Sequence, residues 1–136
     1  NSVIGSWCNL GADTNTSDLK NNYGNVKVWS YRHKKFMETG KIFHGLVMGD
    51  HSKSSINTMF NTGTVVGVNA NIYGNGFPPK FVPSFSWGMG IEREVYDLEK
   101  SFEVARAVYQ RRDMEFSEGD EEIMRHIFKE TATFRS

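Results

Sequence analysis

Residues 48–77, MGDHSK-SSINTM-FNTGTV-VGVNAN-IYGNGF, divide into five six-residue units. The fifth residue of each unit is Gly, Ala, Ser or Thr, and four of the five leading residues are apolar. A period of six is neither the 3.6 of an α-helix nor the alternation of an ordinary sheet, but it is typical of parallel β-helices. The stretch therefore predicts a solenoid in which each hexapeptide forms one short strand and one corner.

The positions within a hexapeptide carry separate expectations. We expect the first residue to point into the coil, the small fifth residue to fit a tight space, and the corner to fall on residues that tolerate positive φ. The expected corner residues at position two are Gly49, Asn61 and Gly67, and those at position four are Asn57, Gly63, Asn69 and Asn75. With three hexapeptides per turn, residues eighteen apart stack, which places Met48 beside Val66 and His51 beside Asn69. The alternative, a run of loops, would need about thirty residues without secondary structure, which is uncommon.

Residues 4–15 repeat the template as IGSWCN and LGADTN. Cys8 takes the fifth position there, which favours a small buried side chain over a nucleophile. The period is lost after Thr16 and resumes at residues 42–47 with a weak re-entry strand. We therefore expect residues 17–41 to be an insertion that projects from the solenoid. Its basic run at residues 32–35 is either a phosphate contact or a solvated hairpin tip.

The pattern of sixes stops at Pro78 and Pro79. Residues 78–96 are expected to form an extended strap whose aromatic rings lie over the solenoid surface. Residues 97–130 predict two helices, the first N-capped by Asp97 and the second opened by a Ser117–Asp120 capping box. We expect this helical pair to cap or buttress the end of the solenoid. The residues expected on the inner face of the second helix are Ile123, Met124, Ile127 and Phe128, and those expected on a solvated outer face are Glu99, Arg106, Arg111 and Arg112.

Composition restricts the partners of the chain. Its 136 residues contain 16 basic and 16 acidic side chains, so the net charge gives no electrostatic case for nucleic acid. No apolar run is long enough to suggest a membrane span or a signal peptide, and a single cysteine fits a reducing cytoplasm. Because the repeat is already running at Ile4, we expect the chain to be a fragment that lacks earlier coils.

The runs NLGADTNTSDLKNNYGNVKV, MGDHS, INTMFNTGTVVGVNANIYG and FPPKFVPSFSW resemble the C-terminal part of a family of putative sugar nucleotidyltransferases. That family is itself similar to the bifunctional enzyme that acetylates glucosamine 1-phosphate and then uridylylates it. The resemblance implies a left-handed parallel β-helix, a homotrimer with sites between subunits, acetyl-CoA as acyl donor and a sugar phosphate as acceptor. The nucleotidyltransferase domain, with its glycine-rich loop and Mg²⁺ carboxylates, has no counterpart in this chain.

The bifunctional enzyme carries the motif N-I-G-A-G-T-x-T-C-N-Y-D-G beside its acetyl-transfer site. The residues that match it are Asn9, Gly11, Ala12, Thr14 and Thr16. Asp13 replaces the second glycine, and Asp18 replaces the second asparagine, which contacts substrate in the family. The resemblance thus implies substrate-binding roles for Asn9 and Asp18, and for Lys20, Asn22 and Tyr23 in the following loop. The catalytic histidine of the family would fall before Asn1.

His51 is the remaining candidate for a catalytic base, because acyl transfer needs a group of near-neutral pKa to accept a proton. The competing interpretation is a structural corner histidine; the weaker histidine candidates are His33, His44 and His126.

Two functions stay open for the domain. One is an acyltransferase-like domain, which the loop with Lys20, Asn22 and Tyr23 favours. The other is a non-catalytic trimerisation or regulatory module, which Asp13, Asp18 and the missing histidine favour. A metal-binding solenoid ranks behind both, since no paired ligands are spaced to meet.

Overall fold

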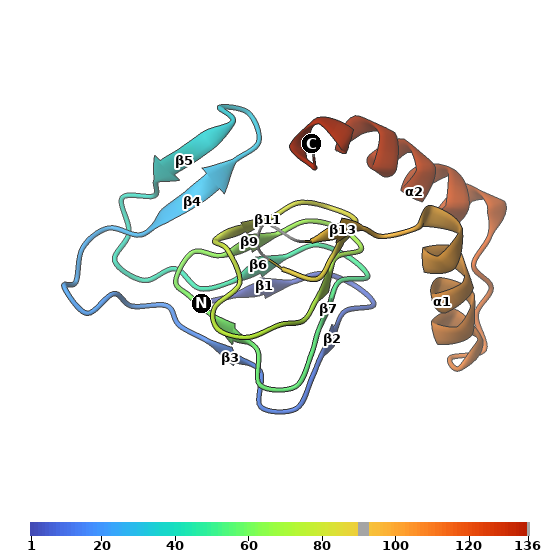
Figure 1. Ribbon diagram of the computed structural model, residues 1–136, viewed down its shortest axis with the longest axis horizontal. Coiled ribbons are helices and arrows are strands. Elements are labelled where there is room, and N and C mark those ends of the chain that lie inside the picture. Colours follow the sequence, from blue (N-terminus) through green and yellow to red (C-terminus); the bar gives the residue numbers. More distant parts are fainter. Residues whose placement is uncertain (90–92, 136) are drawn as a thin grey trace.

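A computed structural model describes residues 1–89 and 93–135. The chain passes in turn through three ladders of short strands, which form the three sides of a stack of coils (Figure 1). Side one contains β1 (Val3–Ile4), β6 (Val47–Met48), β9 (Val65–Val66) and β11 (Phe81–Val82), all parallel. Side two contains the parallel strands β2 (Asn9–Leu10), β7 (Lys53–Ser54), β10 (Asn71–Ile72) and β12 (Ser86–Trp87), followed by antiparallel β13 (Glu94–Val95). Side three contains β3 (Asn15–Thr16) and β8 (Met59–Phe60). The expected β-rich fold of parallel strands is confirmed.

The first residue of each hexapeptide faces the interior, as predicted. All five are buried: Met48, Ser54, Phe60, Val66 and Ile72. Val66 pairs with Met48 and Ile72 with Ser54, so the eighteen-residue stacking is also confirmed. Ile4 and Leu10 hold the same position in the first coil but are 41% and 42% exposed, because no described part of the chain covers that side of the coil. The interior of the stack is therefore closed from the second coil onward.

The corner prediction is right for three of the four residues at position four and wrong for position two. Asn57, Gly63 and Asn69 have positive φ, but Asn75 does not. None of the position-two residues has positive φ: Gly49, Asn61 and Gly67. A Cβ atom added to Gly67 would lie 2.4 Å from the backbone nitrogen of Ser84 in the next coil. Position two therefore requires glycine for space between stacked coils, not for its conformational freedom.

The coils do not stop at Pro78, so the prediction of a strap is wrong for residues 81–87. Val82 pairs with Val66, and Phe85 forms a fully buried corner with φ of 58°. The spacing from Val66 to Val82 is 16 residues rather than 18, and this shortened turn hides the repeat from a search for sixes. The part of the predicted strap at residues 90–92 lies outside the described residues.

Pro83 occupies position two of this last coil. In the earlier coils the N–H at position two donates to the first-position carbonyl of the next coil, as in Gly49 to Val66 and Gly67 to Val82, both at 2.9 Å. Pro83 has no N–H, and it follows β11, the end strand of its ladder among residues 1–89 and 93–135. Proline is tolerated there because it is at the edge of the ladder.

The insertion is an antiparallel hairpin of β4 (Lys27–Ser30) and β5 (Lys35–Glu38). We expected this insertion to project from the solenoid. Instead it is attached to the stack, because Trp29 stacks on Phe81 of side one with ring centroids 4.4 Å apart. Phe134, in the final 3₁₀ turn (Ala132–Phe134), meets both rings edge-on. The hairpin thus joins the last coil and the C-terminal segment in one aromatic cluster.

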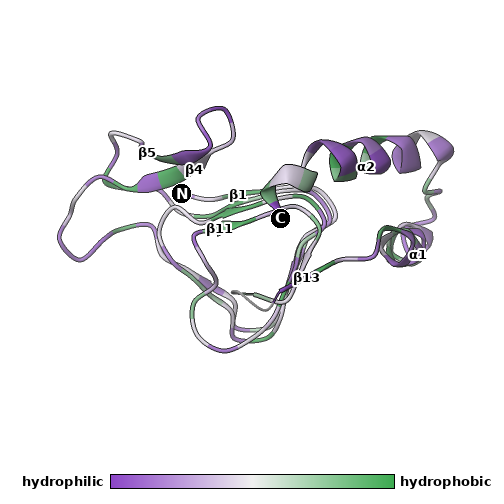
Figure 2. Ribbon diagram, turned by 45° about the horizontal axis from the view of Figure 1, so that its top comes forward, coloured by the Kyte–Doolittle hydropathy of each residue, from purple (hydrophilic) through white to green (hydrophobic). Residues whose placement is uncertain are grey.

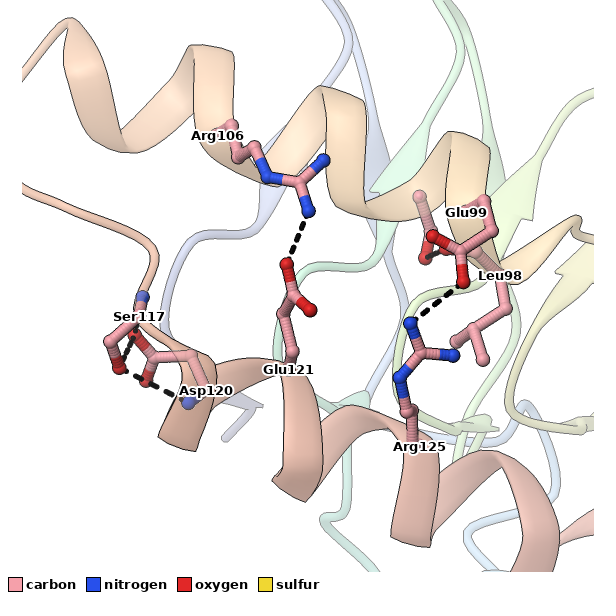
Figure 3. Close-up of polar contacts among 8 residues, drawn as sticks. Leu98, Glu99, Arg106, Ser117, Asp120, Glu121 and Arg125 are labelled. Carbon is pink, nitrogen blue, oxygen red and sulfur yellow. Dashed lines mark hydrogen bonds and ion pairs between the residues drawn. The ribbon is translucent and has the colours of Figure 1, made fainter.

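The two helices are α1 (Leu98–Gln110) and α2 (Glu118–Glu130). Asp97 caps α1, and the Ser117–Asp120 capping box opens α2 (Figure 3). Both predicted starts are therefore confirmed. The inner-face prediction is wrong for Ile123, which is 57% exposed, whereas Met124 is buried. No helix within the described residues has the length and hydrophobicity needed to span a bilayer.

The helices flank the stack and do not cap its end, in contrast to the prediction. Figures 1 and 2 show α1 and α2 beside the coils, on the opposite side from most of the hairpin and its preceding loop. Tyr109 of α1 stacks on Trp7 of the first coil, and Phe128 of α2 contacts Phe85 of the last. The helical pair therefore contacts coils from the first to the last.

Candidate functional site

One corner of the stack, between sides one and two, carries the residues on which the helices pack. These four residues, the corner column, come from successive coils and all have positive φ: Trp7, His51, Asn69 and Phe85. The backbone N–H groups of the last three reach back to the preceding coil, as when His51 donates to the Ser6 carbonyl at 2.9 Å and Phe85 to that of Val68 at 2.8 Å. This corner, at which every residue of the column has positive φ, thus spaces four side chains along one edge, where α1 and α2 cover them.

The end of α1 and the first two coils enclose a pocket of about 570 Å³. We call it the basic pocket; its lining residues are Trp7, Cys8, Asn9, Lys53, Val108, Arg111 and Arg112. Three of these are cations and none is a carboxylate. A hollow of similar volume beside Tyr73, Trp87 and Glu94 has a carboxylate in its lining and no cation. The basic pocket is therefore the best candidate for an anionic ligand.

Side two supplies the floor of the basic pocket. Asn9 and Lys53 are paired across β2 and β7, and both side chains point outward because they precede the inward residues Leu10 and Ser54. The Lys53 ammonium donates to the His51 carbonyl at 2.8 Å, which leaves two of its three N–H donors for other partners. Burial lowers the pKa of Lys53 from its ordinary value, and the neighbouring Cys8 opposes the shift.

The Cys8 thiol is hydrogen-bonded and neutral. Its Sγ donates to the Gly49 carbonyl at 3.1 Å, and burial raises the pKa of Cys8 from its ordinary value. A thiol is a nucleophile only as the thiolate. The interpretation of Cys8 as a small packing residue therefore fits its surroundings better than a nucleophilic role.

Arg111 and Arg112 supply the other wall, immediately after the last turn of α1. Within the described part of the chain, neither guanidinium takes part in an ion pair. Arg106 and Arg125, by contrast, are paired with Glu121 and Glu99 between the two helices (Figure 3). The predicted solvated face is confirmed, because Glu99, Arg106, Arg111 and Arg112 are all exposed. In addition, Glu99 and Arg106 each form an ion pair with the other helix, and Arg111 and Arg112 line the basic pocket.

His51 lies beneath the helical pair and not in an open site. It is 5% exposed, and its ring stacks on Tyr109 with centroids 5.9 Å apart and meets Phe116 edge-on at 6.2 Å. A general base must come within hydrogen-bond reach of the proton that it accepts. The position of His51 favours the structural interpretation over the catalytic one.

The remaining predicted residues do not gather around Asn9. Asp18 accepts a hydrogen bond from the Asn1 amide at 2.7 Å, and the Asn22 side chain accepts one from the Gly24 N–H at 2.9 Å. Lys20 belongs to the same turn, through its carbonyl, as the exposed Tyr23. This loop is on the opposite side of the stack from α1 (Figure 1). The structure therefore separates Asn9 from Asp18, Lys20, Asn22 and Tyr23.

The other histidines are engaged locally. His44 Nδ1 lies 3.0 Å from the Gly45 carbonyl and His33 Nδ1 lies 2.9 Å from the Ser30 hydroxyl, while His126 is exposed on α2. Among residues 1–89 and 93–135, no group of three His, Cys, Asp or Glu side chains is placed to hold a metal ion.

Lowering the pH should weaken the native state through His51. Burial lowers the pKa of His51 from its ordinary value, the Lys53 charge adds to this shift, and Asp50 and Asp120 oppose it. As the pH falls below about 6.5, the unfolded chain takes up a proton at this histidine before the folded chain does. Stability contributed by neutral His51 is therefore full above pH 7 and declines toward pH 5, by at most about 1.4 kcal/mol per pH unit.

Urea unfolding between pH 5 and pH 8 would measure this decline, with His51→Asn as the comparison. Asn69 shows that asparagine suits the same corner in the next coil, with φ of 57°. The other titrating groups are common to both proteins, so the variant should show a shallower pH dependence. Identical slopes in the two proteins would contradict the assignment.

Searches for related proteins gave no match to any family model and no match to any curated protein.

Proposed function

We propose that this chain is the left-handed parallel β-helix domain of a sugar-1-phosphate nucleotidyltransferase and that it has an acyltransferase-like role. In this role it would bind acetyl-CoA and a sugar phosphate. The observation that carries the proposal is the position of Asn9, a residue of the matched motif, in a pocket whose charged lining residues are all cations. Both substrates carry phosphate, so a cation-lined pocket beside the motif suits either of them.

The reaction under this proposal is transfer of an acetyl group to an amine. The amine nitrogen attacks the thioester carbonyl and forms a carbon–nitrogen bond as the carbon–sulfur bond breaks. The CoA sulfur leaves as a thiolate and takes up the proton that the nitrogen loses. The chain's part is to bind and orient the charged substrates. We propose no proton transfer by His51, since Tyr109 and Phe116 cover its ring.

A homotrimer in the cytoplasm belongs to the same proposal. Ile56, Met59 and Phe77, at and beside side three, are apolar and exposed, with Ile56 at 67%. Exposed apolar side chains that lie close together are typical of surfaces that associate. The free thiol of Cys8 suits a reducing compartment.

The proposal predicts release of CoA by the full-length protein. Acetyl-CoA would be supplied with a panel of amino-sugar phosphates, and pyrophosphate release with nucleoside triphosphates would be measured in parallel. We expect both products, with the first depending on the amino-sugar phosphate. Pyrophosphate release without CoA release for any acceptor would reject the acyltransferase-like role.

Pyrophosphate release without CoA release would favour the other candidate, a non-catalytic trimerisation or regulatory module. Its supporting observation is the burial of His51 together with the departures from the motif at Asp13 and Asp18. Light scattering on the same preparation would then decide whether the module trimerises.

A further inference from the structure

We propose that the basic pocket is a binding site for phosphate groups and that Arg111 and Arg112, to which the resemblance assigns no role, provide most of its affinity. The inference deepens the proposed function and rests on it for the identity of the natural ligand. Its physical basis is independent, because it comes from the charges and contacts of the pocket itself.

The cations of the pocket come from two separate parts of the fold. Lys53 is on β7 of the second coil, and Arg111 and Arg112 follow α1, more than fifty residues later. The position of Arg111 and Arg112 at the end of a helix is partly explained by the helix dipole, which favours cations at the C-terminus. The dipole does not explain a lysine on a different element that faces the same pocket.

The charge of the pocket is not neutralised from within. Its lining has three cationic side chains and no acidic one, and the arginines form no ion pair with the described residues. Like charges gathered at one hollow repel one another, although water screens the exposed Arg111 and Arg112 more than the half-buried Lys53. An anion in the pocket would offset this excess of positive charge.

The hydrogen-bond donors match phosphate rather than a simple halide. Each guanidinium presents a planar fork of N–H groups that fits two oxygens of a phosphate, and Lys53 has two N–H donors besides the one that it gives to the His51 carbonyl. The Asn9 amide adds a neutral donor on the same floor. With a volume of about 570 Å³, the pocket has room for more than one phosphate group.

Binding in this pocket would also connect the helices to the coils. The ligand would contact side two through Asn9 and Lys53 and the end of α1 through the arginines. A ligand that binds only the folded arrangement stabilises it by mass action. Occupancy should therefore raise the melting temperature of the protein.

The test is calorimetric titration with inorganic pyrophosphate, CoA and a hexosamine 1-phosphate at low salt. The main variant is Arg111→Gln/Arg112→Gln, and its matched control is Arg32→Gln/Lys34→Gln, which removes the same net charge from the exposed hairpin. We expect the main variant to bind pyrophosphate at least about tenfold more weakly and the control to bind as the wild type does. The thermal shift with pyrophosphate should shrink in parallel.

Three outcomes would overturn the site: no pyrophosphate binding by the wild type at millimolar concentration, equal affinity in wild type and main variant, or equal loss in both variants. The last result would indicate diffuse attraction to net charge. Preferential binding of CoA or of the hexosamine phosphate would identify the source of the phosphate. Pyrophosphate binding that depends on the arginines, in a full-length protein that releases no CoA, would retain the site and reject the acyltransferase-like role.

Discussion

Replacing Phe102 with alanine is expected to lower the free energy of unfolding by about 3–5 kcal/mol, the usual cost of removing a fully buried aromatic ring. Phe102 is 0% exposed and lies in the cluster that joins the helices to the corner column. Its ring is 5.7 Å from that of Phe116, and the Arg125 guanidinium lies over it at 4.9 Å. Urea unfolding followed by circular dichroism would measure the loss.

The same substitution should also weaken binding in the basic pocket. Arg111 and Arg112 are held at the pocket only while α1 packs on the stack, so Phe102→Ala should also weaken pyrophosphate binding. Val104→Ala is the matched control, because Val104 is on the outer face of α1 and is 37% exposed. We expect a change within about 0.5 kcal/mol for this control. Similar losses in the two variants would show that the helix is not anchored through Phe102.

Gly67→Ala should be strongly destabilising, although it adds only one methyl group. The new Cβ would lie 2.4 Å from both the nitrogen and the hydroxyl oxygen of Ser84, and the nitrogen belongs to the backbone and cannot rotate away. The third and fourth coils would have to separate, which would strain the hydrogen bond from Gly67 to Val82. We expect a loss of about 3 kcal/mol, at the upper end for overpacked sites.

The control for this prediction is the same change at Gly119. This residue is in α2, where the nearest neighbour of an added Cβ beyond the helix's own backbone would be the Ser117 hydroxyl at 3.6 Å. Alanine is a better helix former than glycine, so Gly119→Ala should stabilise the protein by up to about 1 kcal/mol. The two unfolding midpoints should move in opposite directions. A neutral Gly67→Ala would contradict the close approach of the coils.

The sequence was sufficient for the parts of the fold in which each hexapeptide repeats the same local requirement. The leading residues Met48, Phe60 and Val66 could be placed in the interior because every coil sets the same pattern of inward and outward side chains. Helix starts were equally predictable, since the capping groups of Asp97 and Ser117 act within a few residues. These are local rules, and they hold without knowledge of the rest of the molecule.

The errors arose where contacts between distant segments decide the structure. The fourth coil was missed because a two-residue shortening before Val82 breaks the count, although the hydrogen bonds between coils continue. Glycine at position two was read as a turn residue because its close neighbour, Ser84, is seventeen positions away. In both cases the error concerns how one coil lies against the next, which cannot be inferred from the six-residue period of the sequence.

The candidate site was only partly accessible to sequence reasoning. Asn9 was found through a motif, but its neighbours Arg111 and Arg112 are about a hundred residues later and looked like ordinary solvated charges. No signal for them was present in the sequence: Glu115 follows the arginines at the spacing of a helical ion pair, as it would for ordinary solvated charges. His51 was proposed from its chemistry alone, and only the packing of Tyr109 shows that it is covered.

The proline at the last coil has a consequence for self-assembly. Stacked parallel coils resemble the growing end of a fibre, because each exposed edge can pair with a strand from another molecule. At Pro83 the backbone donor that would hold such a strand is missing, and β13 runs antiparallel along the neighbouring side. A molecule arriving at this end would meet a gap in the ladder on one side and a reversed strand on the other. The last coil is therefore a poor template for a further strand, and this disfavours the end-to-end polymerisation to which stacked parallel coils are otherwise prone.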